Sequence, residues 1–403
     1  MFGTSGQVLR QPLKSQPSCG FSLTADSYTT KGEQDMWNME STASCGSSSV
    51  IASALLCVLL CGIAFAQDRQ SSPGSPAAKS GKIVGLSFVS LQVSNLQKSI
   101  DYYRALGFSP AGDKNPPWIK DEAANRLYNS PGAMSRTAVL TIATTDSGRH
   151  FTLYLREYKD IERGSRADFP ARDPSSTHLG LMVPEADALW AQLKADGLLR
   201  PLSWEGKLMR LPGQNAGGIA YVMDPDGLDV EIVGIKPAAA KTAEQQAAPS
   251  SNPTLHHLGM AVINSEKSKA FYGDLLGAEF PKVTPEWLSG DMWDAAVGGR
   301  GYVIRLINGT YPEAAAPQTP MRFELVEYQK PNRTAIPDYR FSDIAVSCVG
   351  MQVDGLDALY ARLKGAGIKI WSQGGIERLK DGTRSVVVRD PDVDAFVELF
   401  EKP

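Results

Sequence analysis

Hydrophobic and polar residues follow the same pattern in two segments of the chain, which align without a gap. Residues 88–103 (FVSLQVSNLQKSIDYY) match residues 257–272 (HLGMAVINSEKSKAFY). The first half of each segment alternates with period 2, which is typical of a strand with one buried face. The second half has helical spacing, with Asn95 or Asn264 at its start and a Leu-Gly pair after its end. Each segment therefore predicts a strand followed by an amphipathic helix.

A second strand and helix pattern also occurs twice. Residues 178–190 (HLGLMVPEADALW) correspond to residues 348–360 (CVGMQVDGLDALY). Each copy is followed by two apolar runs around an Asp-Pro-Asp turn, at residues 220–232 and 386–399, which predicts a closing hairpin. The order of elements predicts an α+β fold built from four βαβββ modules, two in each half of the chain.

Composition separates these halves. The chain has 403 residues, which suits two domains better than one. Residues 67–81 and 236–253 are rich in Ser, Pro and Ala without apolar periodicity, as expected of a tether and a linker. We therefore expect two domains, at residues 82–235 and 254–403.

The N-terminal region predicts export. Residues 49–66 (SVIASALLCVLLCGIAFA) form an uncharged apolar run that ends in an Ala-Phe-Ala cleavage pattern, and residues 1–48 form an unassigned extension. The run departs from a signal peptide because no basic residue lies directly before it, and a retained membrane anchor is the alternative. We expect a periplasmic, secreted or membrane-tethered protein rather than a cytoplasmic one, with residues 49–66 as its only membrane contact. Cleavage would leave Cys348 as the single cysteine, so no internal disulfide is expected.

Charge points to a small-molecule partner. The formal net charge is -3, and the signs are interspersed along the chain. A nucleic-acid-binding protein needs a basic surface to neutralise phosphates, so this partner class is not expected.

The repeated motifs resemble those of the vicinal oxygen chelate (VOC) superfamily, which includes glyoxalases, bleomycin-resistance proteins and extradiol dioxygenases. The resemblance rests on the strand that opens with His257, the helix with Ser and then an aromatic pair, and Asp-Pro-Asp-Gly at residues 224–227 before a strand that contains Glu. It implies two tandem VOC domains, each with two βαβββ modules that form a cupped mixed sheet. It also implies that modules can be exchanged between chains, as in a homodimer.

The resemblance places metal ligands on the first and last strands of each module. In the first domain these positions hold Phe88, Tyr154, His178 and Glu231. Phe88 cannot bind a cation, and the Tyr154 hydroxyl, with an ordinary pKa of about 10, is a poor ligand at neutral pH. Because two ligands make a weak site, the first domain is expected to hold a vestigial pocket without metal.

In the second domain the same positions hold His257, Glu324, Cys348 and Glu398. Imidazole and carboxylate donors suit Zn, Ni, Mn or Fe(II), and a divalent ion would relieve the repulsion between two buried carboxylates. Cys348 is either a thiolate ligand or a small buried apolar residue. A hydrogen-bonded polar cluster is the alternative for the other three. His256 is expected to point away from the site, because neighbours on a strand face opposite sides.

These assignments predict a metal-dependent, glyoxalase-like lyase or isomerase that acts on a small oxygen-chelating substrate, with Glu324 or Glu398 as the base. The alternative is a non-catalytic binding protein of the bleomycin-resistance kind, whose aromatic residues Phe88, Tyr154, Trp190 and Trp204 would either stack on a ligand or fill the core. An extradiol dioxygenase is less favoured because Cys348 takes the place of one histidine.

Overall fold

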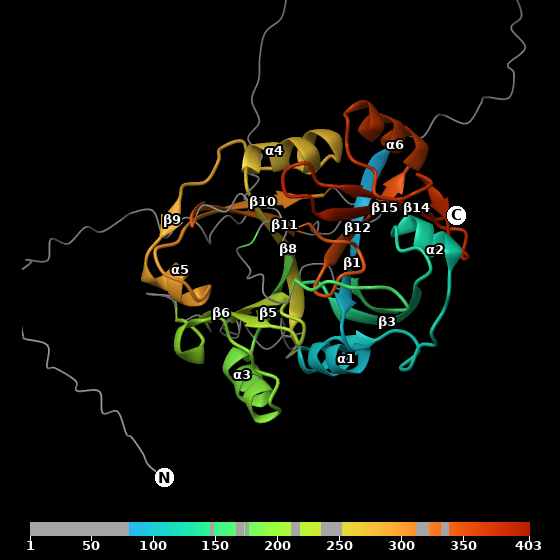
Figure 1. Ribbon diagram of the computed structural model, residues 1–403. Coiled ribbons are helices and arrows are strands. Elements are labelled where there is room, and N and C mark those ends of the chain that lie inside the picture. Colours follow the sequence, from blue (N-terminus) through green and yellow to red (C-terminus); the bar gives the residue numbers. More distant parts are fainter. Residues whose placement is uncertain are drawn as a thin grey trace, which may run out of the picture. The chain divides into compact units, whose positions relative to one another are not determined.

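The computed structural model describes residues 80–145, 149–166, 173, 177–210, 218–234, 252–311, 322–331 and 338–403 (Figure 1). The predicted extension, the apolar run and the tether up to residue 79 lie outside the described residues, as does the predicted linker up to residue 251. Among the helices in the described part, none combines the length and apolar character needed to cross a bilayer.

The predicted order of strands and helices is found in both halves. The first half contains β1 (Lys82–Val93), α1 (Leu96–Ala105), β2 (Ser109–Pro110), α2 (Glu122–Leu127), β3 (Met134–Ala143), β4 (His150–Lys159), β5 (Thr177–Val183), α3 (Ala186–Ala195), η1 (Trp204–Gly206), β6 (Gly218–Met223) and β7 (Asp229–Gly234). The second half contains β8 (Thr254–Val262), α4 (Ser265–Lys269), η2 (Ala270–Leu275), β9 (Leu288–Ser289), α5 (Asp291–Ala296), β10 (Val303–Thr310), β11 (Arg322–Lys330), β12 (Ser347–Asp354), α6 (Leu356–Gly365), β13 (Glu377–Arg378), β14 (Arg384–Arg389) and β15 (Phe396–Glu401).

The first helix of each half begins where the sequence predicts. The side chain of Asn95 accepts a hydrogen bond from the backbone N–H of Lys98, at 3.0 Å. Asn264 caps α4 in the same way through the backbone N–H groups of Glu266 and Lys267. An Asn side chain at this position satisfies backbone donors that have no partner within the helix, so both helices have a defined start.

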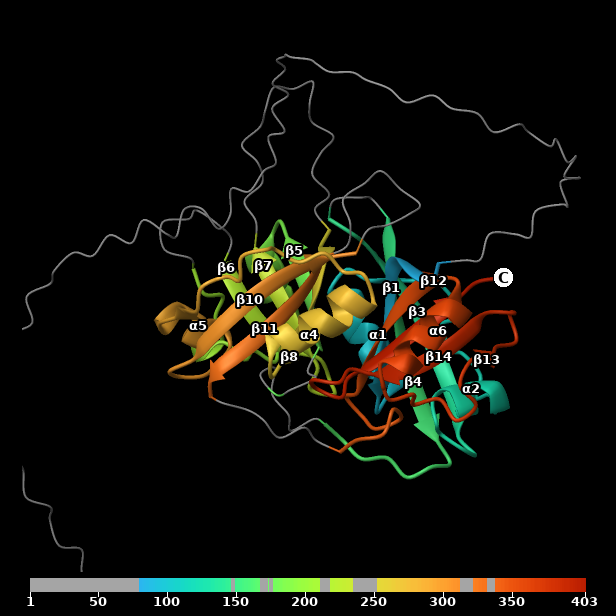
Figure 2. The same ribbon diagram turned by 90° about the horizontal axis from the view of Figure 1, so that it is seen from above.

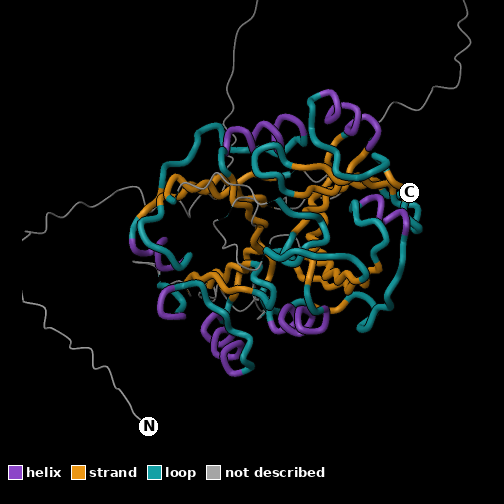
Figure 3. The backbone as a smooth tube through the Cα atoms, viewed as in Figure 1, coloured by secondary structure: helices purple, strands orange, loops and turns teal. Residues whose placement is uncertain are grey.

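The strands form two mixed sheets, and each sheet takes one module from each half of the chain. The eight-stranded sheet has the order β13-β14-β15-β12-β1-β4-β3-β2, and the seven-stranded sheet has the order β6-β7-β5-β8-β11-β10-β9 (Figures 1 and 3). The two halves meet where β1 pairs antiparallel with β12, and where β5 pairs antiparallel with β8. The α+β class, the tandem repeat and the mixed sheets are as predicted. The two modules of one half, however, lie in different sheets.

Helices cover one face of each sheet. Helix α1 packs against β3 and β4, and α6 packs against β15, while α3 contacts β7 and α4 contacts β11 (Figures 1 and 2). Leu258 and Met260 of β8 belong to the hydrophobic core. Because side chains alternate along a strand, His257 faces the other side of the sheet.

The two Asp-Pro-Asp turns connect the sheets within each half. Asp226 Oδ2 accepts a hydrogen bond from the backbone N–H of Ser94, at 3.0 Å, just before α1. In the second half, Asp392 Oδ2 accepts from the backbone N–H groups of Ile263 and Asn264, each at 2.9 Å. Each closing hairpin therefore holds the start of the first helix of its own half, although the two lie in different sheets.

Candidate metal centre

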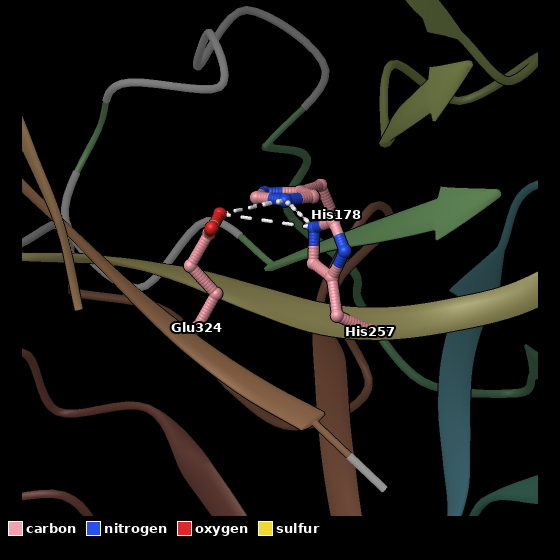
Figure 4. A group of neighbouring side chains, drawn as sticks. All are labelled: His178, His257 and Glu324. Atoms are coloured by element: carbon pink, nitrogen blue, oxygen red, sulfur yellow. Dashed lines mark hydrogen bonds and ion pairs between the residues drawn. The ribbon is translucent and has the colours of Figure 1, made fainter. Parts of the chain in front are cut away.

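Four potential ligands come from four adjacent strands of the seven-stranded sheet. They are Glu231 on β7, His178 on β5, His257 on β8 and Glu324 on β11. Each of the four is at most 7% exposed. Figure 4 shows His178, His257 and Glu324 pointing toward one another from their separate strands.

The polar atoms of these side chains lie close together. His178 Nε2 is 3.1 Å from His257 Nε2. Glu324 Oε2 is 3.7 Å from each of these nitrogens, while Glu231 Oε2 is 3.0 Å from His257 Nε2 and 3.7 Å from His178 Nε2. The group of His178, His257 and Glu324 has ligand atoms that all lie within 4.8 Å of one another.

Two glycines make room for the imidazoles. Gly180 pairs with His257 across the β5–β8 boundary, and Gly259 pairs with His178. A Cβ on Gly180 would lie 2.1 Å from His257 Cε1, and a Cβ on Gly259 would lie 1.9 Å from His178 Cε1. Such distances are far below contact, so the two His-Leu-Gly segments fit only because each glycine faces the other segment's histidine.

Burial and mutual charge control the protonation of this cluster. Burial, and then the charge of His257, lower the pKa of His178 to about 4. Burial also lowers the pKa of His257, but the carboxylates of Glu324 and Glu231 outweigh it and raise that pKa above its ordinary value. Burial, and then repulsion from Glu231, raise the pKa of Glu324 to about 7. Two carboxylates that share one buried site resist full ionisation, and a cation would relieve this conflict.

The donor set fits a divalent metal ion. Ligand atoms about 2.1 Å from one ion lie roughly 3 to 3.5 Å from one another, close to the separations between these side chains. Glu231 Oε2 is buried and accepts no well-aligned hydrogen bond from the described residues, although it lies 3.0 Å from His257 Nε2. A bound cation would satisfy this oxygen, so the residues fit the group that the resemblance implies.

The structure divides the four expected ligands of the second half between two sheets. It brings His257 and Glu324 together with His178 and Glu231. Cys348 on β12 and Glu398 on β15 lie in the eight-stranded sheet, at the positions that match His178 and Glu231. The expectation that the second half alone holds the site, with a vestigial pocket in the first, is therefore corrected, because the strands pair between the halves.

Side chains of the protein itself fill the matching position in the eight-stranded sheet. Glu398 accepts hydrogen bonds from the Tyr128 hydroxyl, at 3.1 Å, and the Ser385 hydroxyl, at 2.8 Å. The buried guanidinium of Arg156 lies 4.2 Å from the Tyr128 ring centre and provides a positive charge for Glu398. Cys348 is fully buried, and this burial raises the pKa of its thiol well above the usual range. Cys348 thus fits the expectation of a small buried apolar residue.

One residue at the end of a helix contributes to the difference between the two sheets. Tyr128 directly follows α2, and Val297 is in the same position after α5. Val297 has no hydroxyl to donate, so Glu231 lacks the hydrogen bond that Glu398 receives from Tyr128. This contrast leaves Glu231 available for a cation.

His256 lies against the cluster instead of pointing away from it. Leu255 pairs with Leu181 and His257 pairs with Gly180, so His256 is an extra residue in β8 that has no partner on β5. This β-bulge interrupts the alternation on which the sequence expectation depended. His256 Nδ1 lies 3.0 Å from His257 Nδ1.

The fold, together with a buried cluster that could hold a metal ion, defines a member of a large superfamily of cupped-sheet proteins. The chain belongs to the Glyoxalase/Bleomycin resistance protein/Dioxygenase superfamily, whose model matches residues 85–232 and 254–393.

Several solved structures resemble the chain. A glyoxalase I mutant from Zea mays is 16% identical, with a TM-score of 0.49 over 80% of this chain and 94% of that chain. A glyoxalase family protein from Bacillus cereus is 16% identical, with a TM-score of 0.33 over 39% of this chain and 97% of that chain. A mutant of 4-hydroxymandelate synthase from Streptomyces coelicolor is 14% identical, with a TM-score of 0.26 over 79% of this chain and 93% of that chain. No curated protein matches the sequence.

Proposed function

We propose that the chain is a divalent-metal-dependent lyase or isomerase of the glyoxalase type, with a single metal site made by His178, Glu231, His257 and Glu324. One observation carries this proposal: His178, His257 and Glu324 are buried with ligand atoms within 4.8 Å of one another, and Glu231 Oε2 lies 3.0 Å from His257 Nε2. The substrate class is a small molecule that presents two adjacent oxygens.

The bound ion would act as a Lewis acid toward these oxygens. His178 and His257 would hold it through their Nε2 atoms, and Glu231 and Glu324 would balance its charge. Glu324 would also move a proton between neighbouring substrate atoms, since a carboxylate whose pKa is raised to about 7 is an effective base near neutral pH. Glu398 has no part in this, because its oxygens are bonded to Tyr128 and Ser385.

An oxygen-dependent enzyme is the second candidate, because one observation favours it. His178, His257 and Glu324 form the two-histidine, one-carboxylate set of non-haem Fe(II) oxygenases. Cys348 does not take the place of a histidine in this set, because His178 completes it. Glu231 favours the first candidate, because a fourth protein ligand leaves fewer positions on the ion for both substrate and oxygen.

A binding protein without metal has less support from the geometry. Phe88 and Tyr154 pack edge to face, with ring centres 4.9 Å apart, in the sheet that lacks the four donors. Trp190 packs against the hydrophobic core, and Trp204 stacks under Arg300 at 4.6 Å. These contacts give all four aromatic residues partners within the protein.

Metal analysis and two reactions test the proposal. Purified protein is dialysed, loaded separately with Zn²⁺, Ni²⁺, Mn²⁺ and Fe²⁺, and analysed for metal per chain. Each form is then assayed with 2-oxoaldehyde and thiol mixtures for isomerisation, and with catechols for oxygen uptake. About one ion per chain and isomerisation without oxygen uptake would support the proposal. Oxygen uptake with Fe²⁺ alone would favour the second candidate, and failure to retain any ion would overturn both.

A further inference from the structure

His256 lies in a bulge that occurs in both sheets, but with different residues. In the seven-stranded sheet the extra residue between Leu255 and His257 is His256. In the eight-stranded sheet Leu86 pairs with Met351 and Phe88 pairs with Gly350, which leaves Ser87 as the extra residue. The fold therefore accepts Ser at this position, and a bulge alone does not require an imidazole.

The contact between His256 and His257 involves the nitrogen that faces away from the cluster. His257 Nε2 lies 3.1 Å from His178 Nε2 and 3.0 Å from Glu231 Oε2, whereas His257 Nδ1 lies 3.0 Å from His256 Nδ1. A neutral imidazole that gives its Nε2 lone pair to a metal must carry its proton on Nδ1. His257 Nδ1–H then donates to His256 Nδ1, so His256 carries its own proton on Nε2.

The two rings also hold each other in place. Their centres are 5.2 Å apart and their planes are at 85°, so the ring of His256 limits rotation of His257 about its side-chain bonds. His256 is half-buried on strand β8, next to Leu255, which is fully buried. Hydrogen bonds to the outer nitrogen of a ligating histidine fix its tautomer and orientation in many metal sites.

We infer that His256 is a positioning residue that accepts a hydrogen bond from His257 Nδ1 and thereby presents His257 Nε2 to the metal ion. This inference rests on the proposed metal site. His256 does not itself contribute a ligand.

Two substitutions separate the hydrogen bond from the bulge. H256S places in β8 the residue that the matching bulge of β1 already carries, so it removes the imidazole and keeps a residue type that the bulge accepts. H256N keeps an acceptor, because Asn Oδ1 can occupy the place of His Nδ1. For both variants and the unaltered protein, the Zn²⁺ dissociation constant is measured by competition with a fluorescent chelator. Thermal unfolding of the metal-free proteins is measured in parallel.

The expected result is that H256S weakens Zn²⁺ binding about 10- to 100-fold, as loss of such outer contacts does elsewhere, while H256N stays within a few-fold of the unaltered protein. X-ray absorption of the Co²⁺-loaded proteins should show two imidazole ligands in all three. Equal binding by H256S and the unaltered protein would overturn the inference. A third imidazole in the unaltered protein, lost in both variants, would make His256 a ligand and would also overturn it. If the unaltered protein binds neither ion, the proposed function fails first.

Discussion

His178 Nε2 and His257 Nε2 lie 3.1 Å apart, although the residues belong to different halves of the chain and are 79 positions apart in sequence. They meet because β5 and β8 pair antiparallel, which places each histidine opposite the glycine of the other strand. A site made in this way needs both halves, and each half contributes one imidazole and one carboxylate.

Glu231 is expected to be necessary for metal binding and Glu398 is not. Replacing Glu231 by Gln keeps the volume but removes the charge of the buried oxygen, which accepts no well-aligned hydrogen bond within the described part of the chain. Metal affinity should fall at least about 10- to 100-fold, the range for outer contacts of metal sites. Glu398→Gln is the matched control, since it changes the equivalent position in the other sheet. Elemental analysis after dialysis distinguishes them, and equal metal loss in both variants would refute the assignment.

Gly180 and Gly259 should tolerate no side chain without loss of metal. The Ala methyl group would lie 2.1 Å from His257 Cε1 or 1.9 Å from His178 Cε1, so the imidazoles would have to move. Overpacking of this kind typically costs about 1 to 3 kcal/mol of stability, and here it would also displace a ligand. Gly350→Ala is the matched control, because its methyl group would meet Phe88 in the other sheet. It should lower the melting temperature without changing metal content, and metal loss in this control would contradict the prediction.

The repeat and the modules could be predicted because they depend on local patterns. Strands and helices are indicated by period-2 and helical spacing over short segments. Their ends are marked by single local features, which are Asn95, Asn264 and the Asp-Pro-Asp turns. The pairing of modules could not be predicted in this way. Alternation determines which face of a strand is buried, but β1 shows the same pattern whether it pairs with a strand of its own half or with β12.

The site could be predicted only in part for the same reason. His257 and Glu324 were predicted as ligands. His178 and Glu231 were placed at equivalent positions of the first domain, but that domain was expected to hold no metal. Grouping ligands by half joined His257 to Cys348 and Glu398, which lie in the other sheet. The contact of His256 with His257 was not predicted, because a bulge shifts the alternation and no local residue pattern marks that bulge.

Asp224 should make the folded state less stable at high pH. Burial, and then repulsion from Asp226, raise the pKa of Asp224 to about 7 in the folded protein, whereas an unfolded Asp has a pKa of about 3.9. Between these values the folded state holds one more proton than the unfolded state, so the free energy of unfolding falls as pH rises from about 4 to about 7. Burial raises the pKa of Asp390, in the matching turn, to about 6, with the same sign.

Asp224→Asn removes this titration. Its Oδ1 can still accept from the backbone N–H groups of Asp226 and Leu228, and its amide can donate to the Tyr103 hydroxyl, which donates to Asp224 Oδ2 at 3.1 Å in the unaltered protein. Relative to the unaltered protein, the variant should gain stability as the pH rises from about 4 to about 7 in urea unfolding. Asp101→Asn, at an exposed position on α1, serves as the control and should show no such gain. A constant difference between Asp224→Asn and the unaltered protein across this range would disprove the role of Asp224.

Cutting the chain between its halves should leave one metal-binding assembly. A specific protease site is inserted at residues 236–251, and cleavage is confirmed on a denaturing gel. The fragments should still elute together in size exclusion and retain their ion, because β1 pairs with β12 and β5 pairs with β8 across the cut. The Ser347 hydroxyl of one fragment also donates a hydrogen bond to the Thr177 hydroxyl of the other, at 2.9 Å.

After separation in denaturant, neither fragment alone should bind Zn²⁺ tightly, since each has only one histidine and one carboxylate of the four. Mixing the fragments should restore binding. Two fragments that separate without denaturant as folded monomers, one of them with the full metal content, would show that a single half makes the site and would overturn this arrangement.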